Sequence, residues 1–102
     1  MTLDAIRKDL KSVRYYYARR AVFDKALREV GNKSIMDLVK KYNDAVNTAP
    51  PKVYDIYISL YVNHRTQEEL SEELDYSPDY VRKLNKGLLK FLQNKFNEQE
   101  DK

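Results

Sequence analysis

The segment from residue 66 to residue 92 constrains the fold most, because it holds two short amphipathic patterns separated by a three-residue break. The first pattern begins at Thr66, and Glu69 three residues later completes the sequence of a capping box. The second begins at Ser77, with Pro78 at the first helical position, where a missing N–H has no cost. So short a connection makes two helices cross steeply, and the segment therefore predicts a helix-turn-helix.

Apolar residues at helical spacing support this motif. Leu70 and Leu74 lie one turn apart on the first predicted helix, and Val81 and Leu84 share one face of the second. Tyr76 falls in the break, where an apolar side chain fills the gap between two such helices. We therefore expect these side chains to pack between the two helices or against the core.

Two residues depart from the commonest form of the motif. Ser71 stands where alanine is usual, at a point where a small residue lets the helices approach closely. Asp75 stands where glycine is usual, and Asp tolerates a left-handed backbone better than most residues. The alternative interpretation is an ordinary helical hairpin inside an all-α core.

The rest of the chain predicts further helices. Apolar residues at a 3-4 spacing predict a long N-terminal helix over residues 1–31, either unbroken or interrupted near residues 18–21. A second helix follows from Ser34, and Pro51 is well placed to open a third. Residues 53–62 would also suit a strand, but the proline pair before them and the lack of a partner strand favour a helix. We therefore expect an all-α fold of four to five helices, with a long N-terminal helix and a C-terminal helix-turn-helix.

These elements divide the chain into three parts. Residues 1–31 form the N-terminal helix, whose narrow apolar stripe favours a partner helix from the same chain or from a second copy in a homodimer. Residues 34–96 form a helical core that contains the helix-turn-helix at 66–96. Residues 97–102 form an acidic tail that we expect to be frayed.

Charge is distributed unevenly around a net charge of +3. Residues 66–79 hold six acidic groups and no basic one, whereas residues 80–96 hold five basic groups and no acidic one. Residues 1–33 hold nine basic groups against four acidic ones. Positive charge is thus concentrated on the N-terminal part and on the second motif helix, which is the electrostatic pattern of a protein that binds a polyanion.

The start of the second motif helix carries the side chains that we expect to reach DNA bases. Arg82 fits the O6 and N7 acceptors of guanine, and Lys83 and Lys86 can reach guanine or phosphate. Asp79 can accept from the N4 amine of cytosine, and Tyr80 can contact a thymine methyl group. Each residue alone could equally be solvated surface, and the group is informative only together with the motif.

A second set of residues is expected to hold the phosphate backbone. Hydroxyl and amide groups near the two helix starts supply part of this set: Thr66, Gln67 and Ser77. The arginines of an aromatic and basic run supply the rest: Arg14, Arg19 and Arg20. Helical spacing turns Tyr17 of this run inward and Tyr15 outward. The run could also stack on single-stranded bases, but packed tyrosines with phosphate-binding arginines are favoured.

Composition argues against several classes of protein. The chain has no cysteine and one histidine, His64, which are too few ligands for a zinc site. The absence of cysteine also fits a reducing cytosol. It has no glycine-rich phosphate loop and no nucleophile beside a base, so we expect no enzyme, no cofactor and no small-molecule substrate. No apolar run approaches the roughly 18 residues of a membrane span, so we expect no membrane association.

A family resemblance covers residues 50–92, which read PPKVYDIYISLYVNHRTQEELSEELDYSPDYVRKLNKGLLKFL. They resemble region 4 of the sigma-70 family, in which a proline-led helix precedes a helix-turn-helix that reads promoter DNA. The whole chain is similar to small transcription regulators of Gram-positive phages, the late-gene activators of the RinA/ArpU type. The resemblance implies a phage-encoded regulator in the bacterial cytoplasm that inserts residues 77–87 into the major groove of double-stranded DNA near host RNA polymerase.

Two other functions fit the same sequence. The first motif helix carries four glutamates that face solvent or bind a basic surface: Glu68, Glu69, Glu72 and Glu73. The chain could therefore be a protein-binding inhibitor or adaptor that acts on host machinery. It could also be a small terminase-like subunit for DNA packaging, which would require assembly into a ring.

Overall fold

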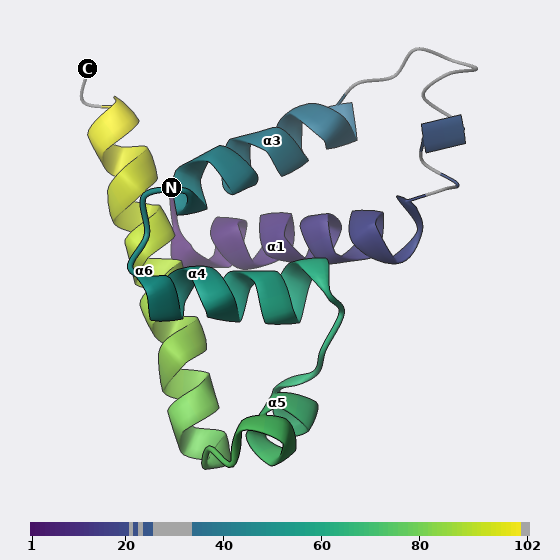
Figure 1. The fold of residues 1–102 in the computed structure, drawn as a ribbon. Helices are drawn as coiled ribbons and strands as arrows, with labels where there is room; N and C mark the ends of the chain where they lie inside the picture. The colour runs from purple at the N-terminus through teal and green to yellow at the C-terminus, as the bar shows by residue number, and fades with distance from the viewer. Residues whose placement is uncertain (21, 23, 26–33, 101–102) are drawn as a thin grey trace.

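The computed structural model describes residues 1–20, 22, 24, 25 and 34–100, and these residues form an all-α fold (Figure 1). The elements are α1 (Leu3–Ala18), α3 (Ser34–Val46), α4 (Pro51–Tyr57), the π-helical segment η1 (Ile58–Val62), α5 (Gln67–Leu74) and α6 (Pro78–Glu100). No strand occurs in this described part of the chain. Nor does it contain a helix with the length and apolar character that a bilayer crossing requires. The predicted fold class is therefore confirmed.

Helix α6 is the longest of these elements, and the other helices pack against it (Figure 1). Helix α1 lies between α3 and the continuous α4–η1 unit, and all three cross α6 along its length. Helix α5 and the first turns of α6 project beyond this stack, at the end of the molecule farthest from α3 (Figure 1). The start of α6 is therefore reachable from outside, while the rest of the helix anchors it.

The core lies where α1, α3, α4 and α6 meet. Its fully buried large side chains come from all four helices: Ile6, Leu10, Val13, Tyr42, Val46, Tyr57, Val81, Leu88 and Leu92. The first three are the 3-4 spaced residues of the predicted N-terminal stripe. Burial of these apolar side chains supplies most of the driving force that holds the helices together.

Helix α1 ends at Ala18, so residues 1–31 do not form one unbroken helix. The residue that follows, Arg19, leaves helical geometry with φ −124° and ψ 31°. Tyr15 is exposed as expected, but Tyr16 is buried and Tyr17 is only half-buried. The reason is that α3 and η1 both pack on α1, so the buried face is wider than a single stripe. The predicted part of this helix at residues 26–31 lies outside the described residues.

The third predicted helix is present and contains a π-turn that the spacing of residues did not indicate. Pro51 opens α4, as expected, and η1 continues the helix through Val62. The N–H of Asn63 donates to the carbonyl of Ile58 at 2.8 Å, and that of Arg65 donates to Ser59 at 2.9 Å. These wide turns end the helix and lead directly into α5.

Residues 97–100 of the predicted acidic tail are helical and not frayed, because α6 continues to Glu100. Asn97 is tied to the other end of the chain, since its Oδ1 accepts a hydrogen bond from the Met1 ammonium at 3.0 Å. Gln93 adds a second bond, from its Nε2 to the Met1 carbonyl at 3.1 Å. These contacts join the start of α1 to the last turns of α6.

Candidate nucleic-acid interface

The start of α6 is built as the sequence predicts. The N–H of Tyr80 donates to the Ser77 hydroxyl at 3.1 Å, which satisfies one donor of the first turn. Pro78 occupies the first position of the helix. Ser77 is therefore the cap of α6, and its side chain holds the first turn in place.

The connection from α5 to α6 depends on Ser71 and Asp75. Asp75 adopts the left-handed conformation, with φ 54° and ψ 36°, in which glycine is usual. Its N–H and that of Tyr76 both donate to the Ser71 carbonyl. The Ser71 hydroxyl in turn donates to the Tyr76 carbonyl at 2.5 Å. Ser71 is thus small enough for the crossing and also bonds the turn, which alanine could not do.

The inward faces of α5 and α6 match the prediction with one exception. Val81 and Leu70 are buried, and Leu84 and Tyr76 are half-buried against the core. Leu74, expected on the same face as Leu70, is 50% exposed. It lines an apolar groove between α4, α5 and α6 because α5 ends at this residue and has no further turn to cover it.

The outward face of α6 brings the predicted base-reading residues together. One shallow hollow is lined by all five of these residues and by Ser77, the cap before them: Ser77, Asp79, Tyr80, Arg82, Lys83 and Lys86. The Arg82 guanidinium is hydrogen-bonded to the Asp79 carboxylate one turn earlier, and both side chains are largely exposed. No described residue pairs with Lys83 or Lys86. An exposed ion pair is worth little, so Arg82 can exchange its partner at low cost.

The start of α5 carries the predicted capping box. The Thr66 hydroxyl accepts from the N–H of Glu69 at 3.0 Å, and the Glu69 carboxylate accepts from the N–H of Thr66 at 3.4 Å. Hydrogen bonds from Arg65 and from Thr66 lower the pKa of Glu69. Thr66 and Gln67 line a hollow that also contains the side chains of Arg14 and Arg65. The structure therefore brings three of the predicted phosphate-binding residues to one place.

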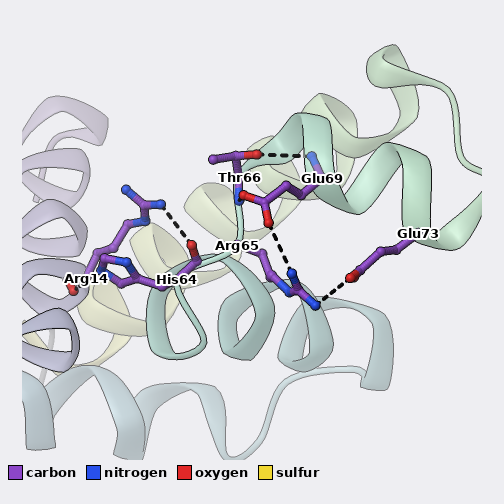
Figure 2. A network of polar contacts seen from close by, with 6 residues as sticks. All are labelled: Arg14, His64, Arg65, Thr66, Glu69 and Glu73. Carbon is purple, nitrogen blue, oxygen red and sulfur yellow. Dashed lines mark hydrogen bonds and ion pairs between the residues drawn. The ribbon is translucent and has the colours of Figure 1, made fainter.

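The Arg14 side chain is hydrogen-bonded to the protein backbone and is not the free surface cation that the sequence suggested. Its Nε donates to the Leu60 carbonyl at 3.1 Å. Its Nη2 donates to the His64 carbonyl at 3.2 Å (Figure 2). The His64 ring lies with Nε2 3.0 Å from the Arg14 carbonyl, and its backbone is left-handed with φ 67°. Arg14 thus holds the end of η1 against α1, and its charge stays beside the hollow at the start of α5.

Arg65 was not singled out from the sequence, although it organises α5. Its guanidinium pairs with Glu69 at 3.1 Å and with Glu73 at 2.5 Å (Figure 2). The spacing of 65, 69 and 73 by four residues was the available signal. The charges of Glu69 and Glu73 are thereby balanced by an ion-pair partner. The other two glutamates of α5, Glu68 and Glu72, line a groove together with Arg82 of α6.

Arg19 and Arg20, the other predicted backbone contacts, are not brought to the start of α6. Both are exposed, and they follow the end of α1 that lies away from α6 (Figure 1). The Arg19 guanidinium lies 5.4 Å from the ring centroid of Tyr15, and Arg20 pairs with Asp24 at 3.7 Å. They therefore lie at a different part of the surface from the residues of α6.

Lys52 is a further cation beside this site that sequence reasoning missed. Its Nζ donates to the Tyr80 hydroxyl at 3.0 Å, and this bond raises the pKa of Lys52. Nothing in the local sequence indicates that the first turn of α4 approaches the first turn of α6. The contact places a fixed positive charge on the flank of the α6 residues.

Comparisons with known proteins identify no relative of this chain. No protein-family model, no curated protein and no solved structure matches this chain. No group of three metal-binding side chains occurs in the part of the chain that the structure describes. The chemistry of the site is therefore inferred from its own geometry and charge.

Proposed function

We propose that this chain is a sequence-specific DNA-binding transcriptional regulator encoded by a phage or prophage. One observation carries the proposal. Asp79, Arg82, Lys83 and Lys86 are exposed on one side of the first turns of α6, while Val81 on the opposite side is fully buried. A helix with polar groups near its start and a packed rear face is suited to enter the major groove.

The proposed roles follow from donor and acceptor geometry. On binding, Arg82 exchanges the Asp79 carboxylate for the two acceptors of a guanine, and Asp79 becomes free to accept from a cytosine amine. Lys83 and Lys86 are available to bind guanine or phosphate. Residues 77–87 are the segment that enters the groove, which the resemblance to sigma-70 region 4 also favours.

Contacts to the phosphate backbone come from the helix starts. Ser77, Thr66 and Gln67 offer hydroxyl and amide groups, and the charge of Arg14 reinforces the hollow that Thr66 and Gln67 line. These contacts would set the orientation of α6 without reading sequence. By the same resemblance, the bound regulator acts near host RNA polymerase.

The proposal is tested by selecting bound sequences from a pool of random duplex DNA at two salt concentrations. We expect an enriched sequence and an affinity that falls steeply with salt, because several phosphate contacts release counterions. A chain that binds every duplex equally would be a non-specific DNA-binding protein. A chain that shows no salt-dependent binding to any duplex would not be a DNA-binding regulator.

A second candidate function is a protein-binding adaptor, and the exposure of Leu74 favours it. Leu74 lines an apolar groove together with Tyr54, Tyr76 and Leu84, beside the glutamates of α5. Exposed apolar grooves mark protein contacts more often than plain surface does. This function predicts no salt-dependent duplex binding, and loss of any effect on transcription by bacterial RNA polymerase in the Leu74→Asn variant.

A further inference from the structure

A row of cations lies along one stripe of α1, and at Arg14 this stripe meets η1 and the hollow at the start of α5. Its members are Arg7, Lys11 and Arg14, which lie four and three residues apart and therefore share one stripe of the helix. The bonds from Arg14 to the carbonyls of Leu60 and His64 fix the direction in which this stripe points. The contacts proposed above use only the last member of the row.

Tyr61 shows how closely the row approaches α6. Its hydroxyl donates to Oδ1 of Asn85 at 2.6 Å, and Asn85 lies directly before Lys86 on α6. Burial raises the pKa of Tyr61, while the positive charges of Arg14 and Arg7 oppose that rise. Arg14, which donates to the carbonyl of Leu60 directly before Tyr61, therefore lies near a side chain that touches α6 beside its exposed residues.

The two outer members of the row are available to a partner. Arg7 and Lys11 are exposed, and no described residue pairs with Lys11. Arg7 pairs with Asp4 at 3.0 Å, but the Asp4 side chain is 92% exposed, so solvent screens the pair. Asp9, the other acidic residue of α1, faces α3 and accepts from the Tyr42 hydroxyl at 2.6 Å. The row itself contains no acidic side chain.

We propose that Arg7, Lys11 and Arg14 form a second contact with the DNA backbone, continuous with the contact at the starts of α5 and α6. This inference rests on the proposed function, because the row reaches the duplex only when α6 occupies the groove. From Arg7 to Arg14 the helix rises about 10 Å at 1.5 Å per residue. Four successive phosphates of one strand, separated by three steps of roughly 3.4 Å along the duplex axis, advance by about the same distance. The row binds phosphates that flank the recognised bases, so it adds affinity without sequence preference.

The first test measures how affinity for the selected duplex depends on salt. Lys11→Gln should lower the slope of log affinity against log salt by about 0.9, the value for one lost phosphate contact. The double variant Arg7→Gln/Lys11→Gln should lower it by about twice that amount. Lys40→Gln is the matched control, since Lys40 is exposed on α3, at the end of the molecule opposite α5 (Figure 1). Arg14 is left unchanged because it supports the fold.

The second test uses the absence of cysteine from the chain. A Lys11→Cys variant carries one thiol, to which an iron chelate that cleaves nearby DNA can be attached. We expect strand cleavage at backbone positions flanking the selected sequence. The same chelate attached to a Lys40→Cys variant should give no cleavage above background.

The outcomes separate this inference from the proposed function. An unchanged salt slope in the double variant and no cleavage from position 11, in a chain that still binds its selected sequence, would overturn the backbone contact of α1 alone. Failure of the unmodified chain to bind any duplex would overturn both proposals. A lower slope together with cleavage from position 11 supports the second contact.

Discussion

Arg14 and Arg82 show how tertiary contacts separate two residues of the same type. Arg14 is half-buried and donates to two carbonyls that lie 46 and 50 residues away in the chain. Arg82 is exposed, and its described partner is an exposed carboxylate on its own helix. Removing Arg14 would therefore leave the end of η1 without its donors, whereas removing Arg82 should leave the fold intact.

Arg82→Ala is expected to weaken binding to the selected sequence by about 1–3 kcal/mol and to relax preference at one base pair. The physical reason is the loss of a bidentate contact with guanine. Affinities for the selected duplex and for its single-base variants measure this effect. An equal loss on every sequence would show that Arg82 contacts phosphate instead.

Asp75 carries a local conformational cost that glycine would remove. Asp75→Gly should raise the free energy of unfolding by about 0.5–1 kcal/mol, because glycine adopts the left-handed backbone without a Cβ clash. Urea unfolding measures the change. Glu72→Gly is the control within α5, and there the same residue should lower stability by about 1 kcal/mol. A destabilised Asp75→Gly variant would mean that the Asp side chain itself supports the turn.

At the scale of single elements, α5 is a short helix that depends on its ends. It has eight residues, and isolated helices of this length are not stable in water. Its start is held by the capping box of Thr66 and Glu69, and Arg65 links its first and second turns. These bonds position α5 against α6 before any ligand is present.

The contribution of Glu69 should depend on pH. Because the fold lowers the pKa of Glu69, its stabilisation is present above the pKa of the unfolded chain, about 4.3, and is lost as the pH falls through the lower folded value. Glu69→Gln should therefore lower the melting temperature at pH 7 but have a much smaller effect near pH 3. Thermal unfolding at the two pH values measures this difference. Glu72→Gln, at an exposed neighbour with no described partner, is the control and should leave the melting temperature at pH 7 nearly unchanged.

At the scale of the whole molecule, a series of side-chain hydrogen bonds joins three helices at the edge of the core. The Tyr57 hydroxyl of α4 donates to Oδ1 of Asn43 on α3 at 2.6 Å. Nδ2 of Asn43 donates to the Tyr17 hydroxyl of α1 at 2.9 Å. These hydrogen bonds fix the relative positions of the three helices, which apolar packing alone would leave less specific.

Tyr57→Phe should cost about 1–2 kcal/mol of unfolding free energy, because Oδ1 of Asn43 loses its donor in a half-buried site. Urea unfolding of the variant and the unmodified chain measures the cost. Tyr54→Phe is the matched control on the same helix, since Tyr54 is 39% exposed. Equal effects of the two substitutions would contradict a structural role for the Tyr57–Asn43 bond.

The sequence alone determined the features that depend on neighbouring residues. The caps at Thr66 and Ser77, the left-handed Asp75 and the exposed side of α6 all follow from local hydrogen bonds and helical spacing, which a short segment contains. The sequence did not predict contacts whose two partners lie far apart along the chain. Leu74 was misplaced because burial on a helix depends on which other helices cover it.

Only the tertiary structure decided how distant segments meet. The bonds of Arg14 to the end of η1 and the contact of Lys52 with Tyr80 each join residues at least 28 positions apart. Such contacts depend on the packing of whole helices around the core, and no periodicity within one segment encodes them.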